Sequence, residues 1–323
     1  MTASPPPESR PGPEPLPGPD QPHGLDSTAQ LMTRLTSQLH TQLTAIRPAG
    51  ARPATRAAAP VLVAVAHGSR DPAALRTVDS LLAAVRAARP GLHAELGHIE
   101  LNEPALPRTL AALPRGAEVV LVPLLFGHGH HVKHDIPRAL ADAPHLRGTV
   151  AEPLGPHPLL AEALHERLTE AVRGESRGPD AVVLAAAGSR DPESADDTRR
   201  IAAVLGERLG GGTPVLPAYA SAARPTVPEA VSTLRAEGHR RIAMASCFTA
   251  PGYFAARCAA EAPWAASSPI GAHPALVRLV LHRFDEACAA VPALRGGARR
   301  GTGTRPAAPA EVPAPALTPL AHA

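Results

Sequence analysis

The stretch Ala64-Val-Ala-His-Gly-Ser-Arg-Asp-Pro72 returns 120 residues later as Leu184-Ala-Ala-Ala-Gly-Ser-Arg-Asp-Pro192. The first copy begins inside Pro60–Ala66, a short continuous apolar run that is typical of a strand buried on both faces of a parallel sheet. A second stretch, Pro153–Leu160, returns in the same way as Pro269–Leu276. Because the spacing between copies is nearly constant, the sequence predicts one duplicated structural unit.

Within the first copy, apolar runs alternate with stretches of helical periodicity. We expect strands over 60–66, 92–101, 118–126 and 149–154, and helices over 73–88, 104–113 and 159–172. Strands that alternate with helices predict an α/β fold with a parallel, doubly wound sheet. Two such domains, the second a repeat of the first, would leave an active-site cleft between them.

The repeats also set the expected domain boundaries. We place an N-terminal domain carrying the active site at 60–175 and a degenerate C-terminal domain at 176–291. Residues 1–59 are expected to be a proline-rich disordered leader, and 292–323 a disordered tail. Leucines recur every fourth residue over 27–46, which predicts a short amphipathic helix within the leader.

Composition excludes several classes of function. The chain of 323 residues has a net charge of only +3 and 2% aromatic residues, which argues against a nucleic-acid-binding surface. Its three cysteines form no Cys-x-x-Cys pair, which favours a reducing compartment. No secretory signal and no apolar run long enough to span a bilayer is present. We therefore expect a soluble, cytoplasmic protein without a nucleic-acid or membrane partner.

Three residues at the ends of expected strands are candidates for a metal site. His67 follows the first strand, Glu100 ends the second, and His131 follows the third. In open parallel sheets ligands bind beyond the carboxyl ends of the strands, so these side chains could converge. Two imidazoles and a carboxylate suit a divalent ion such as Fe²⁺, Co²⁺ or Ni²⁺. Three further histidines crowd the third strand end, and each is individually expected to be a surface or supporting residue: His128, His130 and His134.

The duplication provides an internal control for these candidates. His67 becomes Ala187, and matching Phe126 with Phe248 sets His131 against Tyr253, so the second half lacks the histidines. Residues kept in both halves are better explained by the fold. We therefore expect the repeated His157 and His273 to serve helix starts, and leave two interpretations open for the repeated Arg70, a turn role or substrate contact. Asp135 could orient His131 or cap the next helix, and capping is favoured.

Three stretches resemble the signatures of a known family: Ala66-His-Gly-Ser-Arg70, Ile99-Glu-Leu-Asn-Glu-Pro104 and Gly129-His-His-Val-Lys-His-Asp-Ile-Pro137. They are similar to the CbiX-type sirohydrochlorin chelatases, class II chelatases whose long form carries two related lobes in one chain. The spacing Gly-x-His-Val-x-x-Asp-Ile-Pro is specific, whereas His-Gly-Ser alone would be weak. The resemblance covers about residues 60–290 and implies a chelatase-like, flavodoxin-like fold.

The resemblance also implies an activity. Such enzymes are lyases that insert Fe²⁺ or Co²⁺ into sirohydrochlorin, in siroheme or cobalamin biosynthesis. By this resemblance His67 and His131 would handle the metal, Glu100 would be an acidic residue beside them, and no permanently bound cofactor is implied. Arg70 and Lys133, the one lysine of the chain, would bind the carboxylates of the tetrapyrrole. The metal, Fe²⁺, Co²⁺ or Ni²⁺, is then a substrate, and a monomer with two pseudo-equivalent lobes is expected.

Two other interpretations remain. A non-catalytic metal-binding protein or metallochaperone could use the histidines of 128–134, and would take up metal without binding a tetrapyrrole. A hydrolase with Ser69 as nucleophile is disfavoured, because no Gly-x-Ser-x-Gly motif is present and Ser189 repeats Ser69 in the half without histidines.

Overall fold

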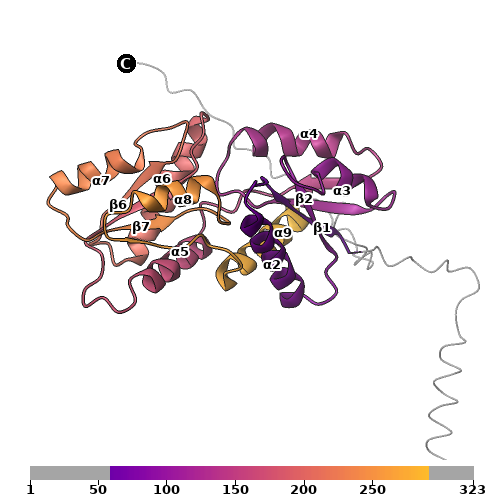
Figure 1. The fold of residues 1–323 in the computed structure, drawn as a ribbon. Helices are drawn as coiled ribbons and strands as arrows, with labels where there is room; N and C mark the ends of the chain where they lie inside the picture. The colour runs from indigo at the N-terminus through magenta and orange to yellow at the C-terminus, as the bar shows by residue number, and fades with distance from the viewer. Residues whose placement is uncertain (1–58, 291–323) are drawn as a thin grey trace, which may run out of the picture. The chain divides into compact units, whose positions relative to one another are not determined.

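The computed structural model describes residues 59–290, so the expected leader, its helix over 27–46 and the tail from 292 lie outside the described residues. Two four-stranded parallel sheets form the framework (Figure 1). In the first sheet the order is β2-β1-β3-β4, and in the second it is β6-β5-β7-β8. The same order in both sheets confirms the expected pair of duplicated α/β lobes.

The strands are short and mostly buried. Those of the first lobe are β1 (Val61–Ala66), β2 (Ala94–His98), β3 (Glu118–Pro123) and β4 (Arg147–Val150). Those of the second are β5 (Ala181–Ala186), β6 (Val215–Tyr219), β7 (Ile242–Ser246) and β8 (Ala265–Ala266). The central strands β1 and β3 are apolar along nearly their whole length because helices cover both faces of a parallel sheet.

The helices follow the strands as the periodicity predicts. The first half contains α2 (Pro72–Ala88), α3 (Leu106–Ala112), the π-helical turn η1 (His131–Asp135), α4 (Ile136–Ala141) and α5 (Pro158–Ala171). The second half contains α6 (Pro192–Arg208), α7 (Val227–Ala236), α8 (Tyr253–Ala260) and α9 (Pro274–Ala290). Proline opens α2, α5, α6 and α9, where its missing N–H costs no helical hydrogen bond.

The two halves exchange their last helices. Helix α9 packs against α2 and β3 of the first lobe, whereas α5 packs against α6 and β7 of the second. In Figure 1 the yellow helix α9 therefore lies beside the indigo helix α2, and α5 lies below β7. One continuous apolar core results, containing residues of both sheets and both exchanged helices.

Matching polar contacts fix the exchanged helices. Arg167 of α5 donates to the carbonyl of Ile270, at 3.1 Å from Nε and 2.8 Å from Nη2, just before α9. Arg283, at the same place in α9, donates through Nε to the carbonyl of Pro153 at 2.8 Å, just before α5. The repeated histidines begin these helices: Nδ1 of His157 accepts from the backbone N–H of Leu159, and Nδ1 of His273 from that of Ala275. Their expected role at helix starts is confirmed.

No helix within residues 59–290 is both long enough and apolar enough to cross a membrane.

Candidate metal and tetrapyrrole site

The turn after β1 brings His67 and Glu100 together. The backbone N–H of Glu100 donates to the carbonyl of His67 at 3.1 Å, which extends the pairing of β1 with β2 beyond the strands. Gly68 lies between them with φ +106°, and a Cβ at this residue would be 1.9 Å from the carbonyl oxygen of Glu100. Only glycine permits both this backbone conformation and this close approach.

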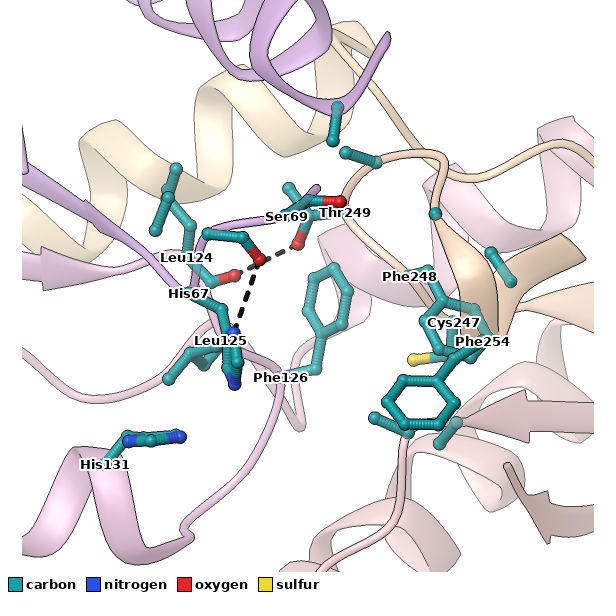
Figure 2. Close-up of a pocket in the computed structure, with 18 of the residues that line it drawn as sticks. His67, Ser69, Leu124, Leu125, Phe126, His131, Cys247, Phe248, Thr249 and Phe254 are labelled. Atoms are coloured by element: carbon teal, nitrogen blue, oxygen red, sulfur yellow. Dashed lines mark hydrogen bonds between the residues drawn. The ribbon is translucent and has the colours of Figure 1, made fainter. Parts of the chain in front are cut away.

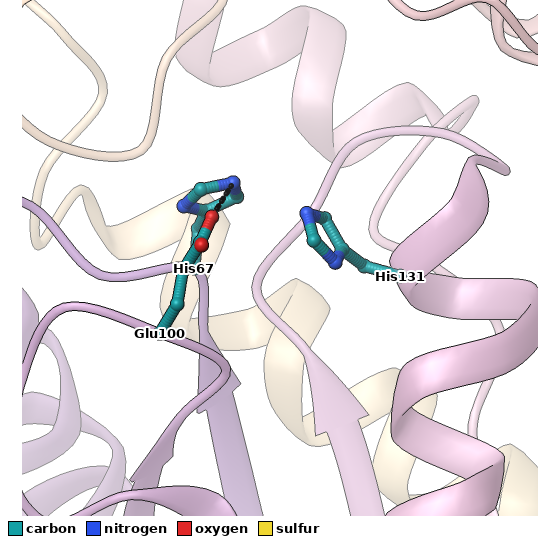
Figure 3. A group of neighbouring side chains, drawn as sticks. All are labelled: His67, Glu100 and His131. Atoms are coloured by element: carbon teal, nitrogen blue, oxygen red, sulfur yellow. Dashed lines mark ion pairs between the residues drawn. The ribbon is translucent and has the colours of Figure 1, made fainter.

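The three candidate ligands form one cluster (Figure 3). Nε2 of His67 lies 3.2 Å from Oε1 of Glu100, and the ring centroids of His67 and His131 are 4.8 Å apart and nearly perpendicular. One ligand atom from each residue falls within 4.8 Å of the others. His67 and Glu100 are exposed and His131 is partly exposed, so a hydrated ion could reach the cluster and retain open coordination positions.

A carboxylate behind His131 sets the orientation of its ring. Nδ1 of His131 donates to Oδ2 of Asp135 at 2.6 Å, one turn further along η1. The proton on Nδ1 leaves the Nε2 lone pair available for a metal. Asp135 makes no side-chain capping bond to α4, so the favoured capping interpretation was wrong and the orienting one is what the structure shows. Single π-helical turns are frequent at functional sites.

A cavity of about 930 Å³ opens beside the cluster. Its lining comes from both lobes: the turns after β1 and β5, and the loops after β3 and β7. In Figure 2 His67 and His131 lie on one side, and Phe248 and Phe254 of the second lobe lie on the other. This volume is at the upper end of the range of about 300–1,000 Å³ that is usual for small-molecule sites, so a large ligand is accommodated.

In the turn after β1, Ser69 and Asp71 stabilise the backbone, whereas Arg70 is available to a ligand in the cavity. Ser69 accepts from the backbone N–H of Asp71 at 3.1 Å, and Asp71 caps α2, so these two residues build the turn and Ser69 has no nucleophile geometry. Ser189 and Asp191 repeat both contacts in the second lobe. Arg70 is exposed, lines the cavity, and has no hydrogen-bond or ion-pair partner among residues 59–290.

Lys133 is placed away from the cavity lining. Its Nζ lies 2.7 Å from Oδ2 of Asp191 and 2.7 Å from Oε2 of Glu193, at the start of α6. Hydrogen bonds to these two carboxylates raise the pKa of Lys133. The ammonium group that we expected to bind substrate thus has two carboxylate partners in the opposite lobe.

The other histidines near β3 lie outside the cluster. His128 is held mainly by the second lobe, where its backbone N–H and its Nδ1 both lie 2.8 Å from Oδ2 of the buried Asp197. Its Nε2 lies 3.1 Å from Glu152 of the first lobe. His130 and His134 are exposed on η1 and beside it, with ring centroids 4.8 Å apart. Among the described residues, only His67, Glu100 and His131 form a group with the spacing of a metal site.

Sequence reasoning missed which residue of the second lobe replaces His131. Hydrogen bonds from Leu154 to Leu125 and from Ile270 to Phe248 make Leu125, not Phe126, the counterpart of Phe248. Equivalent bonds from Lys133 to Gly129 and from Ala256 to Gly252 then pair the two glycines. Counting from the glycines places Phe254, not Tyr253, where the first lobe has His131. Matching the glycines instead of the phenylalanines would have found this in the sequence.

Two parallel-sheet lobes with an accessible His–Glu–His cluster at the cavity between them define the class of two-lobed metal chelatases. The CbiX family model matches residues 61–171 and 181–287. This chain therefore belongs to the CbiX family.

Curated relatives agree with this assignment. The sirohydrochlorin cobaltochelatase of Sulfurisphaera tokodaii is 36% identical over 85 residues, which are 26% of this chain and 71% of the relative. The sirohydrochlorin ferrochelatase of Bacillus subtilis is 30% identical over 176 residues, 53% of this chain and 66% of the relative.

Solved structures share the fold. SirB from Bacillus subtilis with Fe³⁺ is 25% identical and superposes with a TM-score of 0.58, covering 72% of this chain and 96% of that one. A structure of CbiX, described as the terminal enzyme of siroheme biosynthesis in denitrifying bacteria, is 20% identical with a TM-score of 0.53 over 70% of this chain and 99% of that one, and supports the fold alone.

Proposed function

We propose that this protein inserts Fe²⁺ or Co²⁺ into sirohydrochlorin, as a lyase of siroheme or cobalamin biosynthesis. The observation that carries the proposal is the convergence of His67, Glu100 and His131 at one side of a cavity large enough for a tetrapyrrole. Relatives bearing both names, ferrochelatase and cobaltochelatase, support the reaction and leave both metals as substrates.

The three residues can perform the two tasks of chelation. The incoming ion must lose water, and the imidazoles of His67 and His131 can hold it while ligands exchange. Two pyrrole N–H protons must also leave the macrocycle. The Glu100 carboxylate, 3.2 Å from Nε2 of His67, can accept these protons one after the other beside the ring nitrogens and pass them to solvent through its exposed face.

Arg70 fits the carboxylates of the substrate. Its guanidinium lines the cavity without a partner among the described residues, and a planar guanidinium binds carboxylates through paired hydrogen bonds. We propose that Arg70 orients the macrocycle from its edge, and that Lys133 instead joins the lobes through Asp191 and Glu193.

Metallation of sirohydrochlorin, followed by absorbance with Fe²⁺, Co²⁺ or Ni²⁺, tests the proposal. We expect His67→Ala and His131→Ala to lower the rate by more than about 100-fold, because even indirect partners of metal ligands matter 10–100-fold. His134→Ala is the matched control, since its exposed imidazole lies outside the cluster. Metal uptake without metallation, lost in His134→Ala and kept in His67→Ala, would instead establish a metallochaperone.

We also propose that the protein acts as a cytoplasmic monomer. Both walls of the cavity come from one chain, and all three cysteines are free thiols, as a reducing compartment requires. Light scattering coupled to gel filtration should give the mass of a single chain; the mass of a dimer would contradict the monomer.

A further inference from the structure

Apolar side chains that are large and exposed gather at the cavity. Within residues 59–290 these are Leu101, Tyr253 and Phe254, with 55%, 73% and 40% of their surface exposed, and all three line the cavity. The whole chain has only four phenylalanines and two tyrosines. Three of those phenylalanines and one of those tyrosines line the same cavity: Phe126, Phe248, Phe254 and Tyr253. Exposed apolar surface concentrated in this way marks a binding site.

The second lobe lacks the three candidate metal ligands of the first lobe, and one of the residues in their place is aromatic. Ala187 stands in the place of His67, and Ser221 in the place of Glu100, because the bond from Ser221 to the carbonyl of Ala187 repeats that from Glu100 to His67. Phe254 stands in the place of His131. None of these three replacements has a nitrogen or carboxylate ligand, and Phe254 with the neighbouring Phe248 gives this wall of the cavity an apolar surface.

The geometry of the aromatic wall suits a flat ligand. In Figure 2 the phenyl rings of Phe248 and Phe254 lie across the open space from His131, with Phe126 between the two sides. Tyr253 supports Phe254 in an edge-to-face pair, with ring centroids 5.6 Å apart. A ligand lying between the two sides would touch imidazoles on one face and aromatic carbon on the other.

We propose that Phe254 is a substrate-binding residue that stacks on the flat face of the tetrapyrrole and presses the opposite face toward His67 and His131. This inference rests on the proposed function, because it names what occupies the second-lobe side of the same cavity. A conjugated macrocycle offers the extended π-surface that a phenyl ring stacks on, whereas a hydrated metal ion does not. Tyr253 acts through Phe254, as a positioning residue that restricts the tilt of its ring.

Titration of metal-free sirohydrochlorin into the full chain, followed by absorbance, measures this contact without turnover. Stacking on a single aromatic side chain is worth about five- to hundredfold in affinity in other systems, so Phe254→Ala should bind the tetrapyrrole about tenfold more weakly. KM for the tetrapyrrole should rise in parallel while KM for Co²⁺ stays unchanged. Phe254→Tyr keeps an aromatic ring and should retain most of the wild-type affinity for sirohydrochlorin. Tyr253→Ala should weaken this affinity less than Phe254→Ala does.

The outcomes separate this inference from the proposed function. A wild-type chain that binds sirohydrochlorin but does not metallate it overturns the proposed function. The stacking of Phe254 can still be tested in that case, because the titration measures tetrapyrrole affinity without turnover. A wild-type chain that metallates, with Phe254→Ala retaining wild-type tetrapyrrole affinity, overturns the inference alone. Weaker Co²⁺ binding in Phe254→Ala with unchanged tetrapyrrole affinity would overturn it as well. If Phe254→Ala fails to fold, Phe254→Leu keeps the apolar volume and removes the ring, and the same tenfold loss is expected.

Discussion

Asp135 accepts a hydrogen bond at 2.6 Å from Nδ1 of His131, the ring nitrogen opposite the Nε2 atom that we propose as a metal ligand. This carboxylate fixes both the tautomer and the direction of the ring. We expect Asp135→Ala to raise KM for the metal by about 10–100-fold and to leave the tetrapyrrole affinity unchanged. The KM of Asp135→Asn for the metal should lie between those of the wild type and Asp135→Ala, because an amide oxygen can still accept the hydrogen bond but carries no charge.

Asp142→Ala is the control for this substitution. Asp142 follows α4 on the same segment, and within residues 59–290 its side chain makes only an exposed ion pair with Arg138, so removing that side chain should change KM for neither the metal nor the tetrapyrrole. An unchanged metal KM in Asp135→Ala would show that packing alone holds His131 in place.

Arg70 and Arg190 form a matched pair. Both are exposed, both occupy the same position in the repeated turn, and only Arg70 lines the cavity. We expect Arg70→Ala to raise KM for sirohydrochlorin about tenfold, because a charge-assisted hydrogen bond contributes about 1.5–3 kcal/mol. Arg190→Ala should leave it unchanged, and neither variant should alter the free energy of unfolding by more than about 0.5 kcal/mol. Equal effects on KM would mean that Arg70 acts through the turn and not through the substrate.

Gly68 and Gly188 offer a second matched pair. Each has a positive φ, +106° and +88°, and in each case a Cβ would be 1.9 Å from a carbonyl oxygen, that of Glu100 or of Ser221. We expect Gly68→Ala and Gly188→Ala each to lower the free energy of unfolding by at least about 1–3 kcal/mol. Only Gly68→Ala should weaken Co²⁺ binding by the folded protein, since it displaces Glu100, the carboxylate of the candidate metal cluster. If Gly68→Ala retains the wild-type affinity for Co²⁺, then Glu100 is dispensable for metal binding.

The convergence of the candidate metal cluster could be predicted from the sequence because the positions of its residues follow from local pattern. His67, Glu100 and His131 each end or follow a strand, and parallel strands deliver such residues to one edge of the sheet. The exchange of α5 and α9 could not be predicted, because two similar amphipathic helices fit either sheet and long-range packing decides between them. Local sequence likewise shows that Lys133 is charged, but its partners, Asp191 and Glu193, lie far along the chain at the start of α6.

The place of Phe254 was missed for a different reason. The strand-to-helix loops after β3 and β7 differ in sequence at nearly every residue, so matching one phenylalanine with another shifted the alignment by one. Backbone hydrogen bonds to the carbonyls of Gly129 and Gly252 settle the register because they depend on geometry and not on side-chain identity.

His128 should make the stability of the protein depend on pH. Burial lowers the pKa of His128, but hydrogen bonds with Asp197 and Glu152 and the charge of Glu193 outweigh burial and raise the pKa above its usual value. A raised pKa in the folded state stabilises the fold fully below the unfolded value of about 6.5, and this contribution is lost as pH rises through the folded value. We therefore expect His128→Gln to lower the free energy of unfolding more at about pH 6 than at about pH 8.5, as urea denaturation would measure. If His128→Gln lowers the free energy of unfolding by the same amount at both pH values, the imidazole contributes hydrogen bonds but no charge interaction between the lobes.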